Sequence, residues 1–236
     1  MALIPIRKDQ LLQEIDKKLE EKTNSEPKRT YIGASSIGDD CSRKLWYRYH
    51  TDIKEMFSAD TIRKFNDGHR SEDVMAEHLR MVDGVELYTH KEDGTQYGFK
   101  DGLFAGNYDG IIRYLPISSK WHIWEHKSVN EKKFEKLISF KNANEKTALR
   151  NWDSVYYAQA VVYMHYEGLE RHYLTASTAG MRDYTSVRTD ADPAYAQVLI
   201  HKARRIGTLK TPPERIGNKD FYKCKWCFFN EMCHEA

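Results

Sequence analysis

Three charged residues, Asp109, Glu125 and Lys127, could together hold a metal ion and act on a phosphate group. Alternate side chains of a β-strand share a face, so Glu125 and Lys127 point the same way while His126 points to the other face. A hairpin would bring Asp109, in the preceding strand, beside Glu125. Carboxylate oxygens suit Mg²⁺ or Mn²⁺, and a lysine beside such an ion could orient water or stabilise charge developing on a phosphate. The same pattern also fits a solvated sheet face.

Two helical pairs flank this set. His69 and Glu72 stand three residues apart before the predicted sheet, and Gln159 and Tyr163 stand four apart after it, so each pair shares a helix face. His69 could give a nitrogen ligand to the same metal ion. The alternatives are a partly buried structural histidine, a surface amide and a core aromatic.

All four cysteines of the chain could belong to one metal site. Cys41 stands alone, whereas Cys224, Cys227 and Cys233 form a C-x₂-C-x₅-C motif near the C-terminus. Such a site would tie the start of the fold to its end. Four thiolates can hold either Zn²⁺ or a [4Fe–4S] cluster, and the spacing does not separate the two. The alternative is a set of buried structural cysteines.

Composition favours a soluble, intracellular protein, which we expect to be cytoplasmic. The 236 residues are 40% hydrophobic and contain no apolar run of membrane-spanning length, and the opening MALIPIRKDQ lacks the apolar stretch of a signal peptide. The formal net charge is only +2, so any surface that binds nucleic acid must be local. Two basic groups could contact a phosphate backbone or could be solvated helix faces: Arg43, Lys44 and Arg48, and Lys202, Arg204 and Arg205.

The elements that must position these residues follow from hydrophobic periodicity. Helices are predicted at about 8–22, from Cys41 to His50, and at 59–82, 130–147, 152–166 and 193–206. Between them, VELYTH, QYGFK, LFAGNYDGIIRYL and WHIWEHKS predict consecutive strands of an antiparallel meander, and HYLTAST and DYTSVRT predict two more strands. The order predicts an α/β core wrapped by helical ends.

Taken together and in this order, the motifs resemble the RecB-like branch of the PD-(D/E)XK nuclease superfamily. They are G-H-x-x-E, then an aspartate, E-x-K and Q-x-x-x-Y. The stretch SSIGDDCSRKLWY and the tail CKWCFFNEMC are similar to the iron–sulfur members of that branch, which include the CRISPR-associated exonucleases. The resemblance runs from about residue 31 to the C-terminus. It implies an N-terminal helical extension at 1–30 and a single nuclease domain at 31–236, with a mixed sheet and ends joined by the cysteines.

Carried over by position, the resemblance implies a role for each motif residue. His69, Asp109, Glu125 and the carbonyl of His126 would bind the catalytic Mg²⁺ or Mn²⁺, and Lys127 would be the catalytic lysine. Gln159 and Tyr163 would position DNA or active-site groups, Glu72 would orient a ligand, and the four cysteines would hold a [4Fe–4S] cluster. Tyr108 stands where the superfamily name has a proline.

The expected function is a metal-dependent DNA exonuclease acting on single strands or DNA ends. Protein partners in recombination, repair or CRISPR adaptation, or a place in phage DNA metabolism, would follow from the resemblance; the sequence sets no oligomeric state. Two alternatives stay open: a flap or structure-specific endonuclease of the same fold, and a zinc-stapled DNA-binding adaptor without activity. Four aromatic residues are expected to shield the cluster: Trp46, Tyr47, Trp226 and Phe228.

Overall fold

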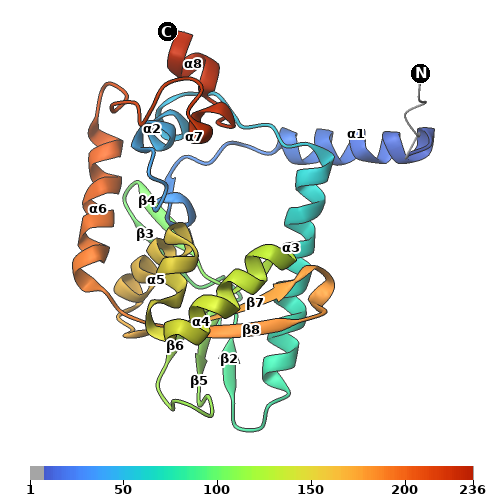
Figure 1. The fold of residues 1–236 in the computed structure, drawn as a ribbon, viewed down its shortest axis with the longest axis vertical. Helices are drawn as coiled ribbons and strands as arrows, with labels where there is room; N and C mark the ends of the chain where they lie inside the picture. The colour runs from blue at the N-terminus through green and yellow to red at the C-terminus, as the bar shows by residue number, and fades with distance from the viewer. Residues whose placement is uncertain (1–7, 236) are drawn as a thin grey trace.

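A five-stranded mixed sheet forms the centre of the computed structural model, which describes residues 8–235 (Figure 1). The strand order is β2-β5-β6-β7-β8, in which β6 and β7 are parallel and the other neighbours are antiparallel. The strands are β2 Glu86–Tyr88, β5 Gly110–Arg113, β6 His122–Val129, β7 Arg171–Thr178 and β8 Tyr184–Asp190. Because parallel neighbours need a crossover connection, two helices separate β6 from β7.

Helices cover both faces of this sheet. Met75 and Ala76 of α3 pack against Trp124 on one face, while Ile123, the next residue along β6, packs on the other face in the main core with α4 and α5. Side chains with cap oxygens begin each of these helices, as expected for helix N-termini. The helices and their caps are α3 Ala59–Arg80 (Ser58), α4 Glu131–Trp152 (Asn130), α5 Ser154–Glu167 (Asp153) and α6 Pro193–Thr208 (Asp192).

A second, three-stranded sheet corrects the predicted meander. Its order is β1-β4-β3, with β1 Ile32–Gly33, β3 Gly98–Asp101 and β4 Phe104–Asn107, and β2 pairs with β5 rather than with β3. The run LFAGNYDGIIRYL was predicted as one strand, but it breaks at Tyr108 and Asp109. The buried ring of Tyr108 and a hydrogen bond from Tyr163 to the Asn107 carbonyl hold the chain where it passes from one sheet to the other.

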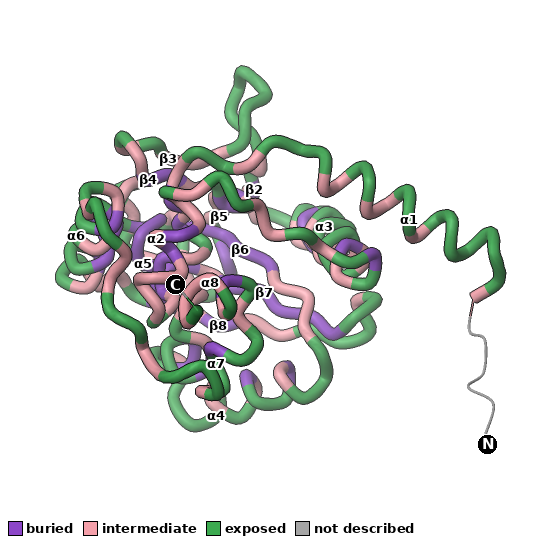
Figure 2. The backbone as a smooth tube through the Cα atoms, turned by 90° about the horizontal axis from the view of Figure 1, so that it is seen from above, coloured by how far each residue is buried: buried purple, intermediate pink, exposed green. Residues whose placement is uncertain are grey.

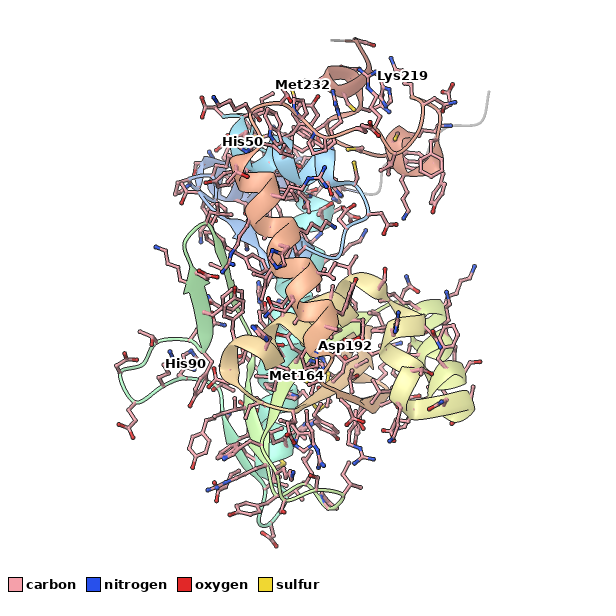
Figure 3. The ribbon with its side chains drawn as sticks, turned by 90° about the vertical axis from the view of Figure 1, so that its left-hand side faces the viewer. His50, His90, Met164, Asp192, Lys219 and Met232 are labelled. Atoms are coloured by element: carbon pink, nitrogen blue, oxygen red, sulfur yellow. The ribbon has the colours of Figure 1, made fainter. Side chains whose placement is uncertain are left out.

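The remaining elements are α1 Gln10–Ser25, η1 Ala34–Ser36, α2 Ser42–His50, η2 Ala179–Met181, α7 Tyr222–Lys225 and α8 Asn230–Glu235. Of these, α2 lies beside the C-terminal helices α7 and α8 at one side of the molecule (Figure 1). Helix α2 is fixed to the end of α6, because Trp46 Nε1 donates to the Leu209 carbonyl over 2.8 Å and the His50 ring lies 2.9 Å from the Ile206 carbonyl. Figure 3 shows His50 and Asp192 at opposite ends of α6.

Helix α1 projects from the N-terminal end of α3 and buries none of its residues (Figures 1 and 2). It is held by an ion pair between Asp16 and Arg63 and by Glu20, which accepts a hydrogen bond from the Ala59 N–H over 2.7 Å. The predicted N-terminal helix is thus confirmed. Residues 1–7 of the predicted extension lie outside the described residues.

The other predicted helices and the strands β7 and β8 are confirmed to within a few residues. Cys41 is the N-cap of α2 rather than part of it, with a β-region backbone and a thiol that accepts from the Lys44 N–H over 3.4 Å. Helix α4 continues to Trp152 across a kink at Asn144, where φ is −167°. Within residues 8–235 there is no helix with the length and apolarity needed to cross a membrane.

A buried histidine gives the first prediction. His172 of β7 is 1% exposed and neither ring nitrogen has a hydrogen-bond partner among the described residues. Burial, together with the charge of Lys127, lowers the pKa of His172 to about 3. Between that value and about 6.5, the unfolded chain binds a proton that the folded chain does not, so stability falls as the pH falls.

Replacing His172 by Leu should therefore flatten the dependence of the unfolding free energy on pH between about 4 and 6, by up to about 1.4 kcal/mol per pH unit. Urea titrations at several pH values measure this slope. His201→Leu, at an exposed position of α6, is the matched control and should keep the wild-type slope. An unchanged slope in the His172 variant would contradict the assignment of a neutral buried ring.

Candidate active site

Asp109 and Glu125 come together where β5 ends beside β6. Gly110 pairs with Trp124, so Asp109, in a bend just before β5, falls opposite Glu125. Beyond Trp124, β6 has no β5 residue to pair with, and the Asp109 carboxylate takes the place of a strand partner: its Oδ2 accepts the His126 N–H over 2.7 Å. The sequence predicted the pairing but placed Asp109 inside a strand.

Glu125 and Lys127 lie on the same face of β6, as the alternation of strand side chains predicts. Lys127 Nζ lies 2.5 Å from Glu125 Oε2, and the Glu125 side chain is only 2% exposed. Burial, together with repulsion from Asp109, raises the pKa of Glu125 to about 8, against the opposing effect of Lys127. Burial alone would lower the pKa of Lys127, but Glu125 and Asp109 outweigh it and raise that pKa, which keeps the lysine charged.

The His126 ring points to the opposite face, as predicted. Its nitrogens lie 3.0 Å from Thr175 Oγ1 and 3.1 Å from Ser177 Oγ, both on β7. Burial, with the nearby charge of Lys127, lowers the pKa of the ring to about 4, so it is neutral at physiological pH. The N–H and C=O of one strand residue point to the same side, so the His126 carbonyl faces the Asp109 side beyond the end of β5.

Gln159 and Tyr163 meet on α5 and hold the chain that leads to Asp109. Gln159 Nε2 donates to Tyr163 Oη over 3.1 Å, and Tyr163 Oη donates to the Asn107 carbonyl over 2.6 Å. Gly106 allows this contact, because a Cβ there would lie 2.8 Å from a carbon of the Tyr163 ring. Both side chains are buried, so in this structure they fix Asp109 through the backbone.

On α3, Glu72 and His69 both lie near the carboxylates. Burial, followed by the charge of Asp109, raises the pKa of Glu72 to about 7, and Glu72 in turn contributes to the raised pKa of Glu125. The His69 side chain is 80% exposed, with Nδ1 4.0 Å from Glu72 Oε2. The structure thus brings together Asp109, Glu125 and Lys127, with Glu72 and the exposed His69 nearby. Burial raises the pKa of Asp109, and the charges of Lys127 and His69 oppose that shift.

Tyr156 is a neighbour that the sequence analysis missed. Its ring centroid lies 5.6 Å from Lys127 Nζ and 4.4 Å from Lys133 Nζ, and Lys133 also pairs with Asp153 over 2.6 Å. Tyr156 precedes Tyr163 by seven residues on α5, so helical spacing places both on one face. The seven-residue step to Tyr163 could have identified Tyr156 from the sequence.

The residues of this site suit a divalent cation, although the described residues include no three His, Cys, Asp or Glu side chains arranged as a ready metal site. Glu125 Oε1 is buried and has no hydrogen-bond partner among them. A buried carboxylate oxygen without a partner is costly, and a cation would satisfy it while relieving the repulsion between Asp109 and Glu125. The chemistry of the donor set therefore fits Mg²⁺ or Mn²⁺.

All four cysteines line one cavity of about 290 Å³ between α2 and the C-terminal segment. Burial, with smaller contributions from Asp39 and Cys227, raises the pKa of the Cys41 thiol, and burial with Cys233 and Cys227 raises that of Cys224. The thiols are thus near enough to influence one another. The four residues predicted as one group lie around one space.

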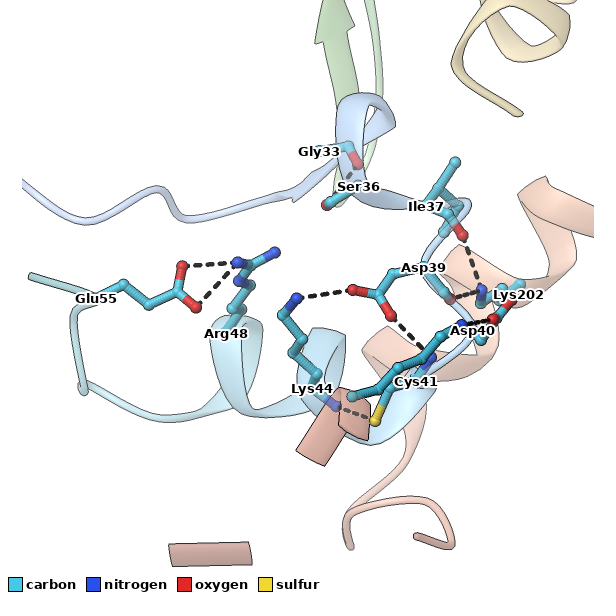
Figure 4. A network of polar contacts seen from close by, with 11 residues as sticks. Gly33, Ser36, Ile37, Asp39, Asp40, Cys41, Lys44, Arg48, Glu55 and Lys202 are labelled. Carbon is cyan, nitrogen blue, oxygen red and sulfur yellow. Dashed lines mark hydrogen bonds and ion pairs between the residues drawn. The ribbon is translucent and has the colours of Figure 1, made fainter. Parts of the chain in front are cut away.

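A polar network holds the loop before Cys41 (Figure 4). Asp39 accepts from the Cys41 N–H over 2.9 Å and from Lys44 Nζ over 2.8 Å, and Lys202 Nζ donates to the carbonyls of Ile37 and Asp39 over 2.8 and 2.6 Å. Arg48 pairs with Glu55. Lys44, Arg48 and Lys202, which the sequence suggested as contacts for a DNA phosphate backbone, therefore make contacts within the protein.

The prediction that four aromatic residues shield the cysteines is wrong for two of them. Trp226 is 85% exposed and Phe228 is 47% exposed. Trp226 and Tyr47 both line the cavity, but only Tyr47 is buried, and its ring stacks on that of Phe229, the next residue after Phe228, with centroids 5.5 Å apart. The second phenylalanine of the motif C-F-F-N-E-M-C, Phe229, is therefore the buried one; it lies just before α8, which begins at Asn230.

Comparison with solved structures identifies the fold. A crystal structure of the protein SSO0001 aligns with a TM-score of 0.53 and 18% identity over 95% of this chain and 96% of that chain. The structure of an alkaline exonuclease from Laribacter hongkongensis aligns with a TM-score of 0.53 and 13% identity, over 80% of this chain and 90% of that chain. That of a phage-related exonuclease from Haemophilus somnus 129PT aligns with a TM-score of 0.50 and 12% identity, over 75% of this chain and 92% of that chain. No protein-family model and no curated protein matches the sequence.

This chain has the fold of these exonuclease structures. The likeness confirms the expected mixed α/β fold, a mixed sheet flanked by helices. At such low identity it shows the fold alone, and the assignment to the PD-(D/E)XK superfamily and to its iron–sulfur branch stays a prediction.

The role of Tyr163 gives a second prediction. Tyr163→Phe removes the hydroxyl that joins Gln159 to Asn107, and should lower the unfolding free energy by about 1–2 kcal/mol because the buried Gln159 amide loses its acceptor. Tyr156→Phe is the control, since that hydroxyl has no protein partner among the described residues; its stability should change by less than about 0.5 kcal/mol. Equal effects in urea titrations would contradict the positioning role.

Proposed function

We propose that this protein is a metal-dependent deoxyribonuclease, an exonuclease that hydrolyses phosphodiester bonds of single-stranded DNA or DNA ends. The observation that carries the proposal is the Asp109, Glu125 and Lys127 group at the end of β5. The likeness to structures named as exonucleases supports it, since the same fold carries that activity in those proteins.

In the proposed site, Asp109 and Glu125 bind Mg²⁺ or Mn²⁺, with the His126 carbonyl and His69 as further ligands. When bound, the ion supplies a Lewis acid for the phosphate and lowers the pKa of a water molecule. Lys127, kept charged by its carboxylate neighbours, would orient the attacking water or stabilise negative charge that develops on the phosphate. Glu72 orients a ligand, and Gln159 and Tyr163 keep Asp109 in place.

End-labelled single-stranded and duplex DNA, incubated with the purified protein and Mn²⁺, tests the proposal. We expect mononucleotides or short products released from an end, and no cleavage in the presence of a chelator. Internal fragments as first products would instead support a flap or structure-specific endonuclease. If the folded protein cuts neither substrate, the adaptor alternative replaces the enzyme.

Variants of Lys127 and of Glu125 should lose cleavage activity for different reasons. Lys127→Ala should reduce cleavage by about 100-fold or more, because it removes charge stabilisation, while Mn²⁺ affinity in calorimetry stays largely intact. Glu125→Ala should weaken Mn²⁺ binding as well, because it removes an oxygen ligand. Lys120→Ala, at an exposed lysine of the β5–β6 loop, should behave as wild type. Full activity in the Lys127 variant would exclude the lysine from the mechanism.

We further propose that Cys41, Cys224, Cys227 and Cys233 hold a [4Fe–4S] cluster. All four cysteines line one cavity of about 290 Å³, which supports a single metal group shared by them, and the resemblance to iron–sulfur nucleases favours the cluster over Zn²⁺. Its role is to join α2 to the C-terminal segment, away from Asp109.

Protein purified without oxygen should accordingly be brown, with broad visible absorbance and about four iron atoms per chain. Cys227→Ser should lose the colour and lower the melting temperature, with cleavage falling as a consequence of unfolding. A colourless protein with one zinc per chain would overturn the assignment of a [4Fe–4S] cluster. The proposed role of the metal in joining α2 to the C-terminal segment would be unaffected.

A further inference from the structure

Gly68 occupies an unusual place on helix α3. It lies three residues before Ser71, four before Glu72 and seven before Met75, so helical spacing puts all four on the side of α3 that faces the sheet. Ser71 and Met75 are each 4% exposed, and the pKa of Glu72 responds to Asp109. Gly68 therefore lies one turn from the candidate active site, on the inward face of the helix.

The space in front of Gly68 is open. Among the described residues, a Cβ added there would have no atom within 4 Å, apart from the backbone of its own helix. Gly207 of α6 shows the usual reason for a helical glycine, because a Cβ there would lie 2.3 Å from Leu103 Cδ2. Packing does not explain Gly68, although glycine inside a helix costs about 1 kcal/mol relative to alanine.

Phe65 continues the same face away from the sheet. It precedes Glu72 by seven residues, or about two helical turns, and is 46% exposed. Its ring packs edge-on against Phe57 with centroids 5.2 Å apart, which fixes its position while leaving it exposed. An exposed, supported aromatic ring is a surface on which an unpaired base can stack.

We infer that the open part of this face of α3, which carries Phe65, Gly68 and Glu72, is a track for a single strand of DNA. Gly68 lets the sugar–phosphate backbone approach the helix next to Glu72 and the carboxylates, and Phe65 stacks a base of the strand about 10 Å from Glu72 along the helix axis. Because a base must be unpaired to stack, the track selects a single strand or a frayed end. This inference rests on the proposed nuclease function and specifies its substrate.

Gly68→Ala separates stability from binding. The added methyl group meets no protein atom and improves helix propensity, so the melting temperature should rise by about 2–4 °C. The same methyl group stands in the path of the strand, so the Kd for a fluorescent single-stranded oligonucleotide should rise at least about fivefold. Binding is measured by anisotropy with Mn²⁺ in a Lys127→Ala background, in which the strand should stay uncut.

Asn66→Ala is the matched control. Asn66 is exposed, lies two residues from Gly68 on the far side of α3, and also gains helix propensity. It should raise the melting temperature without changing the Kd. Phe65→Ala should weaken binding of single strands by about 5- to 100-fold and leave binding of a blunt duplex nearly unchanged.

The outcomes separate this inference from the proposed function. Suppose that the wild type degrades DNA while Gly68→Ala binds single strands as tightly as the Lys127→Ala protein that keeps Gly68. That result would contradict the DNA track but not the proposed nuclease function. Equal weakening by Asn66→Ala would also overturn the track, because the effect would then come from helix stability. If the wild type neither cuts nor binds DNA, the track and the proposed function fail together.

Discussion

The hydrogen bond from the His126 N–H to the Asp109 carboxylate links the fold of this protein to its candidate chemistry. Strand β5 starts one residue too late to pair with β6 beyond Trp124, which leaves the backbone of β6 open at that point. The Asp109 side chain, instead of a strand residue, accepts the His126 N–H there. Asp109 thereby lies opposite Glu125, and the His126 carbonyl, on the same side of β6 as its N–H, faces the Asp109 side without a β5 partner. Charge repulsion and burial make this arrangement costly for carboxylates alone, and a cation would relieve it.

The remaining architecture keeps that point fixed. Helix α5 anchors the chain before Asp109 through Tyr163, α3 brings Glu72 to the other side, and the eight-residue strand β6 crosses the buried centre of the sheet. The two groups of candidate residues lie apart: the cysteines line a cavity between α2 and the C-terminal segment, and the carboxylates and Lys127 lie at the middle of the sheet.

Residue spacing predicted much of this arrangement because periodic patterns report local geometry. The alternation of Glu125, His126 and Lys127, the four-residue step from Gln159 to Tyr163 and most helix limits are local, and the structure agrees with them. The break at Tyr108 and Asp109 was not predictable in this way. It depends on contacts between distant segments, such as the approach of Tyr163 to Gly106, which leave no periodic signal. The exposure of Trp226 was missed for the same reason, since composition alone does not say which aromatic residue of the tail packs on Tyr47.

The most direct test of the account is to locate the cation itself. Crystals of the protein soaked in Mn²⁺ would give an anomalous difference map in which each bound ion stands out. The account predicts a peak in contact with the carboxylates of Asp109 and Glu125 and with the His126 carbonyl, and no such peak in crystals of Glu125→Gln. A well-ordered crystal without a peak at this place, or with a peak that survives the Glu125→Gln change, would contradict it.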